Sequence, residues 1–225
     1  MFEYDVVKAI KRIDNKNKEE ILTDVSFHIP SDKYTINNTY FFYGTVLSIR
    51  FNIKKRLVEP EKEESIIIKW YNLFVSETYE IVKSNMSFRD FMVLQNEVII
   101  IYNTSLKHEM DKLIDDMGRI NTLIKIINKK LNIDNERTNI SLAACYDKML
   151  MYKITDNKYY WKGDNIEKAS SLTLNNDKKN MIINRPIWTN LFEDNQKMFE
   201  RMDSKHELYC GSIINIALNN MLYNK

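Results

Sequence analysis

The spacing of hydrophobic and polar residues along the chain predicts an alternation of helices and strands. Apolar side chains at helical spacing predict four longer helices: 3–14, 66–82, 106–131 and 166–174. Runs rich in β-branched and aromatic residues predict four strands: 39–52, 139–146, 149–155 and 181–184. Two further apolar runs, 91–94 and 98–102, flank the polar residues Gln95, Asn96 and Glu97. This pattern is typical of a β-hairpin with a polar tip.

The run at 39–52 is apolar on both sides in its middle, which predicts a central strand of a sheet covered on both faces. Asp147 and Lys148 interrupt the next apolar stretch, and we interpret them as a hairpin turn between two strands. Near the end, Arg185-Pro186 is expected to open a helix that reaches Phe192, and 204–216 is expected to be a final strand.

This order of elements predicts an α+β fold of the ferredoxin-like plan, with a mainly antiparallel sheet flanked by helices. The sequence has no repeat and no linker long enough to separate two domains. We therefore expect an N-terminal helix and arm over 1–38 and a single globular unit over 39–225. The segment 54–64, which contains Pro60, is expected to be a charged loop, and 21–28 a strand or a binding arm.

The net charge of +2 gives no electrostatic footprint for nucleic acid or an anionic membrane. The N-terminus lacks the apolar core of a signal peptide, and no apolar run is long enough for a membrane span, so we expect a cytoplasmic protein. Cys145 and Cys210 lie in apolar sequence and are expected to be buried thiols. The histidines, His28, His108 and His206, show no zinc-site spacing.

One segment, YYWKGDNIEKASSL at 159–172, combines an aromatic strand, one of only four glycines and a helical pattern. A glycine at a strand-to-helix corner lets a helix N-terminus approach a phosphate, although a plain structural corner is the commoner case. The candidate ligand-binding residues at this corner are Trp161, Lys162 and Gly163.

Together, four segments resemble the catalytic domain of class III nucleotide cyclases. The resemblance is strongest to the Pycsar-type pyrimidine (uridylate and cytidylate) cyclases of bacterial antiphage defence. The segments are TYFFYGTVLSIRFN at 39–52, QNEVIIIY at 95–102, AACYDKML at 143–150 and YYWKGDNIEKASSL at 159–172. The residues that match the family in place are Asp147, Trp161, Gly163, Ala169 and Leu172. The resemblance covers residues 6 to 216 or so and implies the family's ferredoxin-like fold.

In active members of that family, two aspartates hold two divalent cations, and an asparagine and an arginine on one helix act on the ribose and the transition state. The resemblance places Arg50 and Asn96 at the two aspartate positions, and Glu167 and Ser171 at the other two. An arginine cannot ligate Mg²⁺, an asparagine binds it more weakly than an aspartate, and a serine has no guanidinium group for a phosphate. Glu167 would repel a triphosphate. The neighbouring Glu97 is expected to face the opposite side of its strand.

The resemblance therefore implies a catalytically degenerate domain with no catalytic residue, no metal and no cofactor. We expect Arg50 either to hold an anion or to pair with a local carboxylate such as Glu167. The leading hypothesis is a pseudocyclase that binds, senses or serves as a partner subunit in antiphage defence. It implies a homodimer or a heterodimer with a cyclase-like subunit, and a nucleotide as a possible ligand.

Two alternatives remain open at the level of sequence. The first is an active cyclase that makes cyclic UMP or cyclic CMP and holds Mg²⁺ or Mn²⁺ with Glu97, Asp147 or Asp164. The second is a binding module or scaffold unrelated to nucleotides, which would make contacts through the arm at 15–38 and the charged loop at 54–64.

Overall fold

A computed structural model describes residues 6–16, 21–22, 39–54, 60–155, 158–174, 181–203 and 207–223. The strands form one nine-stranded sheet with the order β3-β4-β2-β5-β7-β9-β8, to which β1 adds beside β2 and β6 beside β5. The strands are β1 (Ile21–Leu22), β2 (Thr39–Ile53), β3 (Phe88–Val93), β4 (Glu97–Tyr102), β5 (Thr138–Thr155), β6 (Lys158–Lys162), β7 (Met181–Asn184), β8 (Phe199–Asp203) and β9 (Leu208–Gly211). Most strand pairs are antiparallel, and only β1 with β2 and β5 with β7 run parallel.

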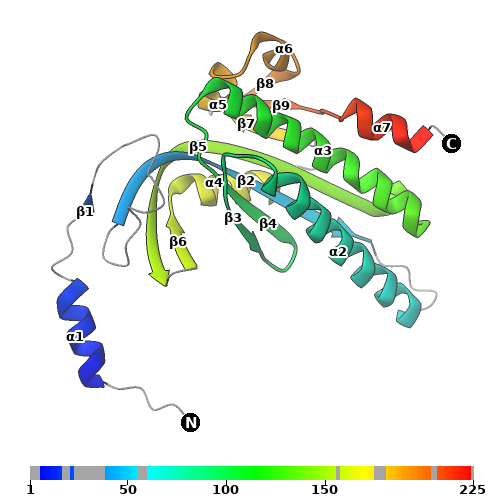
Figure 1. The fold of residues 1–225 in the computed structure, drawn as a ribbon. Helices are drawn as coiled ribbons and strands as arrows, with labels where there is room; N and C mark the ends of the chain where they lie inside the picture. The colour runs from blue at the N-terminus through cyan, green and yellow to red at the C-terminus, as the bar shows by residue number, and fades with distance from the viewer. Residues whose placement is uncertain are drawn as a thin grey trace.

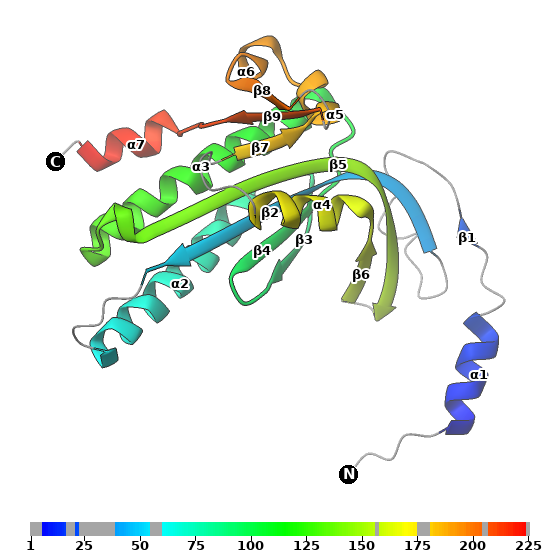
Figure 2. The ribbon, with the colours of Figure 1, turned by 180° about the vertical axis from the view of Figure 1, so that it is seen from behind.

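Helices cover both faces of this sheet. The helices of the described chain are α1 (Val6–Lys16), α2 (Pro60–Lys83), α3 (Lys107–Leu131), α4 (Asp164–Leu174), α5 (Arg185–Thr189), α6 (Glu193–Gln196) and α7 (Ile216–Tyr223), with a 3-10 turn at Asn135–Arg137. The long helices α2 and α3 run along one face (Figure 1), and α4 crosses the opposite face (Figure 2). This α+β architecture confirms the predicted fold class. None of the described helices is long and apolar enough to cross a membrane.

The central strand β2 is buried on both faces, as its sequence predicted. Leu47 and Ile49 pack with the α2 and α3 side of the core. Val46 points the other way, into the cluster that contains Ala169 of α4. All four side chains are fully buried. Because successive side chains of β2 point to opposite faces of the sheet, the strand contributes to two separate apolar layers. Cys145 and Cys210 are buried free thiols, as expected.

The predicted hairpin turn at 147–148 is wrong. Asp147 and Lys148 continue the ladder of β5 by pairing with Gly44 and Tyr43 of β2, and β5 runs unbroken for 18 residues. The two polar side chains are partly or fully exposed along this stretch, so they need no turn to reach solvent. β2 is long enough to pair with β5 continuously, and this pairing keeps residues 147 and 148 in the strand despite their polar side chains.

Two other boundaries differ from the sequence expectation. Helix α2 begins at Pro60, so part of the expected charged loop is helical; proline is well suited to the first helical position, and the acidic residues that follow favour the helix N-terminus. The expected final strand at 204–216 is shorter in the structure, where β9 ends at Gly211 and helix α7 begins at Ile216, and the preceding strand β8 was not predicted. Of the expected strand or arm at 21–28, residues 23–28 lie outside the described residues. The boundary at residue 38 stays a prediction.

Candidate functional site

Arg50 and Asn96, which the resemblance places at the metal-ligand positions of cyclases, meet in the structure. Arg50 of β2 lies directly opposite Glu97, the first residue of β4. The Arg50 guanidinium donates from Nη2 to Glu97 Oε2 at 3.0 Å and from Nη1 to Asn96 Oδ1 at 3.3 Å. Arg50 therefore pairs with Glu97 rather than with Glu167, which corrects the partner suggested from the sequence.

The expectation that Glu97 faces away from position 50 is also wrong. Residues directly opposite each other in an antiparallel pair project to the same face of the sheet. The hairpin closes at Asn96, and this register brings the Glu97 carboxylate to the face that carries the Arg50 side chain. The Arg50 guanidinium group and the Glu97 carboxylate therefore form an ion pair on one face of the sheet.

Glu97 is only 5% exposed, and its oxygens accept hydrogen bonds from side chains of two other elements, β2 and α4. Ser48 of β2 donates to Oε1 at 2.6 Å, and Ser170 of α4 donates to Oε2 at 3.1 Å. Ser48 also contacts Thr173 of α4 at 3.0 Å. We call Ser48, Arg50, Glu97, Ser170 and Thr173 the polar cluster. Its hydrogen bonds satisfy a buried carboxylate, which would be strongly unfavourable without its partners.

The corner at Gly163 is set by close packing. A Cβ at this position would lie 2.5 Å from Asn165 Oδ1 and 3.2 Å from the carbonyl oxygen of Lys148. The side chain of Asn165 is buried and donates to the carbonyl oxygen of Gly44 at 3.2 Å. Glycine is therefore required here because α4 starts immediately against the sheet.

The other two corner residues point in different directions. Trp161 is buried and donates from Nε1 to Asp90 Oδ2 at 2.5 Å, and its ring lies edge-on to Phe42 at 5.6 Å between centroids. Lys162 is exposed. Trp161 thus has a structural role in the core, and a role of Trp161, Lys162 or Gly163 in ligand binding stays a prediction.

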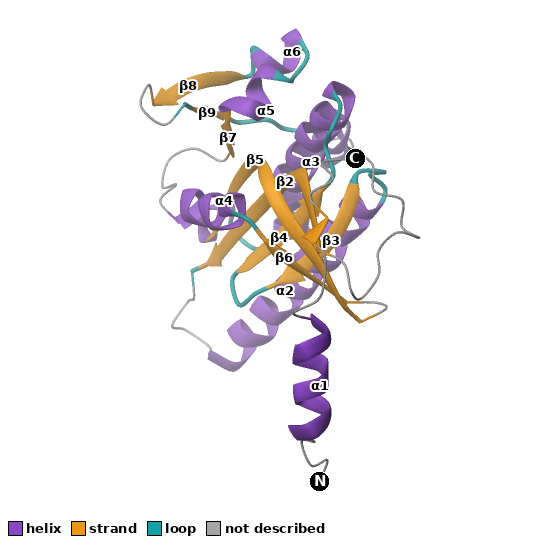
Figure 3. Ribbon diagram, turned by 90° about the vertical axis from the view of Figure 1, so that its left-hand side faces the viewer, coloured by secondary structure: helices purple, strands orange, loops and turns teal. Residues whose placement is uncertain are grey.

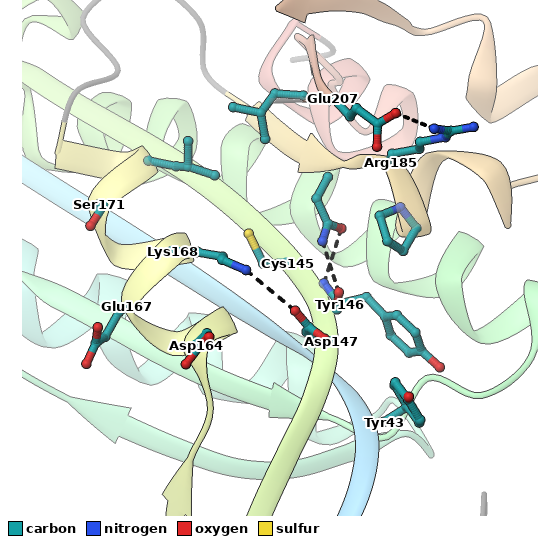
Figure 4. A pocket seen from close by; sticks show the side chains of 14 residues that line it. Tyr43, Cys145, Tyr146, Asp147, Asp164, Glu167, Lys168, Ser171, Arg185 and Glu207 are labelled. Atoms are coloured by element: carbon teal, nitrogen blue, oxygen red, sulfur yellow. Dashed lines mark hydrogen bonds and ion pairs between the residues drawn. The ribbon is translucent and has the colours of Figure 1, made fainter. Parts of the chain in front are cut away.

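The positions Glu167 and Ser171 lie on the other side of α4. Both line a pocket of about 1000 Å³ between α4, β5 and the start of α5 (Figure 4). We call it the α4–β5–α5 pocket. Neither Arg50 nor Asn96 lines it. Within one chain, the four cyclase-equivalent positions therefore form two separate pairs, with α4 between them.

The pocket has an acidic balance and an aromatic end. Asp147 pairs with Lys168 at 3.6 Å, and Glu207 pairs with Arg185. Asp164 and Glu167 line the same pocket, and neither makes a hydrogen bond or an ion pair with the part of the chain that the structure describes. The two acidic residues in the first turn of α4, Asp164 and Glu167, thus have carboxylates without an ion-pair partner among the described residues.

Tyr43 and Tyr146 form the aromatic end, with stacked rings whose centroids are 5.9 Å apart. Burial, and then the proximity of Tyr43, raises the pKa of the Tyr146 hydroxyl. Burial raises the pKa of Cys145 to about 12, so this pocket-lining residue is a neutral thiol rather than a nucleophilic thiolate at neutral pH. The two phenolic rings offer flat surfaces, and Cys145 contributes packing.

Sequence reasoning did not find Tyr43, Tyr146 or Asn184 as parts of a site. Asn184 fixes the wall of the pocket, because its side chain accepts from the backbone N–H of Tyr146 at 3.2 Å and donates to the carbonyl oxygen of Tyr146 at 2.9 Å. Of the three carboxylates proposed for an unusual metal site, Asp147 and Asp164 lie in this pocket, whereas Glu97 belongs to the polar cluster.

Comparison with known proteins supports one family. No family model matches the sequence. A curated protein from Treponema porcinum, described as a uridylate cyclase, is 24% identical over 235 aligned residues, covering 99% of this chain and 82% of that protein. The alignment therefore extends over essentially the whole chain and beyond the four segments that suggested the resemblance.

Solved structures with the same fold are nucleotide cyclases or resemble them. A class III adenylyl cyclase-like ATP-binding protein from Pseudomonas aeruginosa has a TM-score of 0.65 at 9% identity, over 95% of this chain and 48% of that one. A dimeric guanylyl cyclase domain of the RhoGC fusion protein from the fungus Blastocladiella emersonii has a TM-score of 0.57 at 11% identity, over 79% and 98%. The chain therefore has the fold of the catalytic domain of class III nucleotide cyclases, and its sequence is similar to that of a uridylate cyclase.

Proposed function

We propose that this chain is a pseudocyclase, a cyclase-like protein that binds a partner or a ligand without converting a nucleoside triphosphate. The observation that carries the proposal is the ion pair between Arg50 and Glu97, with Nη2 and Oε2 3.0 Å apart. A permanent cation stands where the family places a metal-binding carboxylate, and the neighbouring carboxylate is already neutralised by it.

The opposite face of α4 supports the same conclusion. By the resemblance, Glu167 and Ser171 replace the residues that orient the ribose and stabilise the transition state in the family. The carboxylates of Asp164 and Glu167, which have no ion-pair partner among the described residues, repel a triphosphate. Loss of one well-placed electrostatic group typically lowers a rate by about 10²- to 10³-fold. Changes at all four positions therefore leave little room for useful turnover, even though such effects are not additive.

The relatives are consistent with a binding role. The matched structure from Pseudomonas aeruginosa is described as an ATP-binding protein that resembles adenylyl cyclases, and the matched curated protein is described as a uridylate cyclase. We extend this to a pyrimidine nucleotide as the candidate ligand, a homodimer or a heterodimer with a cyclase-like subunit as the assembly, and bacterial antiphage defence as the setting.

The first test is direct. Pure full-length protein is incubated with Mg²⁺ or Mn²⁺ and each nucleoside triphosphate, and the products are separated by mass spectrometry. The proposal expects no cyclic nucleotide above the level of a heat-inactivated sample. Formation of cyclic UMP or cyclic CMP by the wild-type chain would overturn it.

A second test examines the positions themselves. The double change Arg50→Asp and Asn96→Asp creates a group of acidic side chains beside Glu97, so Mn²⁺ should raise the melting temperature of this variant. The matched control, Arg50→Leu with Asn96→Asp, carries one acidic side chain fewer and should respond less. Adding Glu167→Asn and Ser171→Arg to the first variant should bring back nucleotide binding, measured by calorimetry. Equal responses of the two variants to Mn²⁺ would show that position 50 is not the metal position.

A second candidate function is an active cyclase with an unusual metal site, although the described residues contain no group of three or more His, Cys, Asp or Glu side chains arranged to hold a metal ion. Asp147, Asp164 and Glu167 all line the α4–β5–α5 pocket. If they held Mg²⁺ or Mn²⁺, the wild-type chain would make a cyclic nucleotide, and Asp147→Asn and Asp164→Asn would each abolish the product. The change Glu77→Gln on the exposed side of α2 is the matched control.

A further inference from the structure

The α4–β5–α5 pocket combines negative charge with aromatic and apolar walls. It lies where α4, the middle of β5 and the junction of β7 with α5 come together, and Figure 3 shows β7 and α5 above α4 beside the sheet. We propose that this pocket binds a linear polyamine, an aliphatic chain that carries several ammonium groups. The inference goes beyond the proposed function, because it assigns a cationic ligand to the chain whether or not a nucleotide binds.

The backbone of the pocket wall offers a ligand few groups to bind. Between its pairing with β7 and its pairing with β6, β5 has an edge that no described strand covers. Along this edge the Asn184 side chain binds both the backbone N–H and the carbonyl oxygen of Tyr146. The backbone N–H of Lys148 donates to Asp147 Oδ1 at 2.7 Å. Because these backbone groups already have partners, recognition of a ligand falls to the side chains.

The charges of these side chains favour a cation. Four carboxylates and two basic side chains line the pocket, an excess of two negative charges. Both basic side chains are paired with carboxylates of the pocket. The other two carboxylates, Asp164 and Glu167, have no hydrogen-bond or ion-pair partner among the described residues. They lie three positions apart in the first turn of α4 and are therefore neighbours on its surface, so one ligand can contact both.

The other walls suit the carbon chain of a polyamine. Tyr43 is 38% exposed and stacks on Tyr146, and cations are attracted to the faces of such rings. Leu172, Pro186 and Leu208 supply apolar surface against which methylene groups pack. The volume of about 1000 Å³ is at the upper end of the range of about 300–1,000 Å³ that small-molecule sites occupy. The pocket therefore accommodates an extended chain rather than a single small cation.

Two other classes of ligand match the pocket less well. No group of three or more possible metal ligands comes together among the described residues, so the carboxylates are not gathered around one metal position. A nucleoside triphosphate is an anion and would be repelled by the two carboxylates of α4 that have no counter-charge in the described chain. A polyamine carries its charges apart along a chain, as the pocket carries its carboxylates on separate elements.

The test is calorimetric titration of the full-length protein with spermidine, in the absence of nucleotides and metal ions. We expect saturable binding of a single spermidine per chain, with an affinity that falls as the salt concentration rises. Asp164→Asn with Glu167→Gln should weaken this binding by about tenfold, because both carboxylates that lack a partner are lost. The matched control, Glu77→Gln with Glu136→Gln, removes two exposed carboxylates outside the pocket and should bind as the wild type does.

A second pair of variants tests the aromatic wall. Tyr43→Leu removes the ring and should weaken spermidine binding by about threefold, whereas Tyr43→Phe keeps the ring and should bind as the wild type does. Circular dichroism verifies that each variant is folded before it is titrated.

Four outcomes would each overturn the proposal. They are a wild-type chain that does not bind spermidine, an affinity that neither the carboxylate variant nor Tyr43→Leu changes, tighter binding of Mg²⁺ than of spermidine, and tighter binding of a trilysine peptide than of spermidine. Cyclase activity is not among the readouts, so the result is independent of the proposed function.

Discussion

Replacement of Asp116 by asparagine is expected to stabilise the protein at neutral pH and not at low pH. Asp116 lies on α3 and is 3% exposed. Its Oδ2 accepts from Asn85 Nδ2 at 2.8 Å and from the Tyr102 hydroxyl at 3.4 Å, and its Oδ1 lies 3.8 Å from Arg119 Nη1. Burial dominates over these partners and raises the pKa of Asp116 from 3.8 to about 6, with Asp115 adding to the rise.

The magnitude and the sign follow from this shift. A rise of about two pKa units corresponds to about 3 kcal/mol of difference between the charged and neutral forms. Because the pKa is higher in the folded state than in the unfolded state, the folded state binds the proton more tightly. The stabilisation of the folded state by this tighter proton binding is fully present below about pH 4 and is lost as the pH rises through about 6. At pH 7.5 the ionised carboxylate therefore costs the folded state up to about 3 kcal/mol.

Asparagine keeps an acceptor for Asn85 and for the Tyr102 hydroxyl and carries no charge. The attraction to Arg119, which asparagine gives up, is already part of the net rise of the pKa to about 6 and is not subtracted again. We therefore expect Asp116→Asn to raise the free energy of unfolding by up to about 3 kcal/mol at pH 7.5. The gain should shrink toward zero near pH 4.

The assay is urea unfolding of the wild type and the variant at half-unit steps from pH 4.5 to 8, followed by circular dichroism. The difference between the two free energies isolates residue 116 from the other titrating groups. Glu77→Gln, a change of an exposed carboxylate on α2, is the control and should give a nearly flat difference. A difference for Asp116→Asn that does not change with pH, or one that falls as the pH rises, would refute the reasoning.

Three further changes test the packing around the site. Arg50→Leu leaves Glu97 buried without its cation and should lower the free energy of unfolding by about 3 kcal/mol, and adding Glu97→Gln should recover much of this in urea unfolding. Gly163→Ala forces a Cβ against the side-chain oxygen two residues later and should lower stability by about 1–3 kcal/mol, visible as a lower melting temperature. Asn184→Ala removes both hydrogen bonds to the Tyr146 backbone, so the backbone amide of Tyr146 should exchange its hydrogen faster. An unchanged exchange rate would mean that the strand pairing alone holds this part of β5.

The parts of the fold that could be predicted are those in which one local pattern repeats for many residues. Helix α3 and strand β2 were predicted within a residue or two, because their spacing of apolar side chains is regular over 25 and 15 residues. The polar pair Asp147 and Lys148 misled the prediction for β5. Only the tertiary partner, β2, shows that the strand continues through them.

The site was predictable to a similar extent. Comparison with a known family identified positions 50 and 96, and the structure brings their side chains together. The partner that matters most, Glu97, was assigned to the wrong face, because a hairpin that closes one residue earlier or later reverses every side chain. The α4–β5–α5 pocket combines residues from β2, β5, α4 and α5 and from the start of β9, and no spacing along the chain reveals that they meet.

The polar cluster has a consequence for the evolution of this protein. A single substitution of Arg50 by aspartate would leave two carboxylates, at 50 and 97, facing each other on adjacent strands beneath α4. That intermediate is penalised before any metal-dependent function could compensate, because the buried Glu97 loses the charge that neutralises it. A lineage with this ion pair would have to change the glutamate first or both residues together. Under the proposed pseudocyclase function, this ion pair would keep descendants of the chain from regaining a metal site at position 50 through single substitutions.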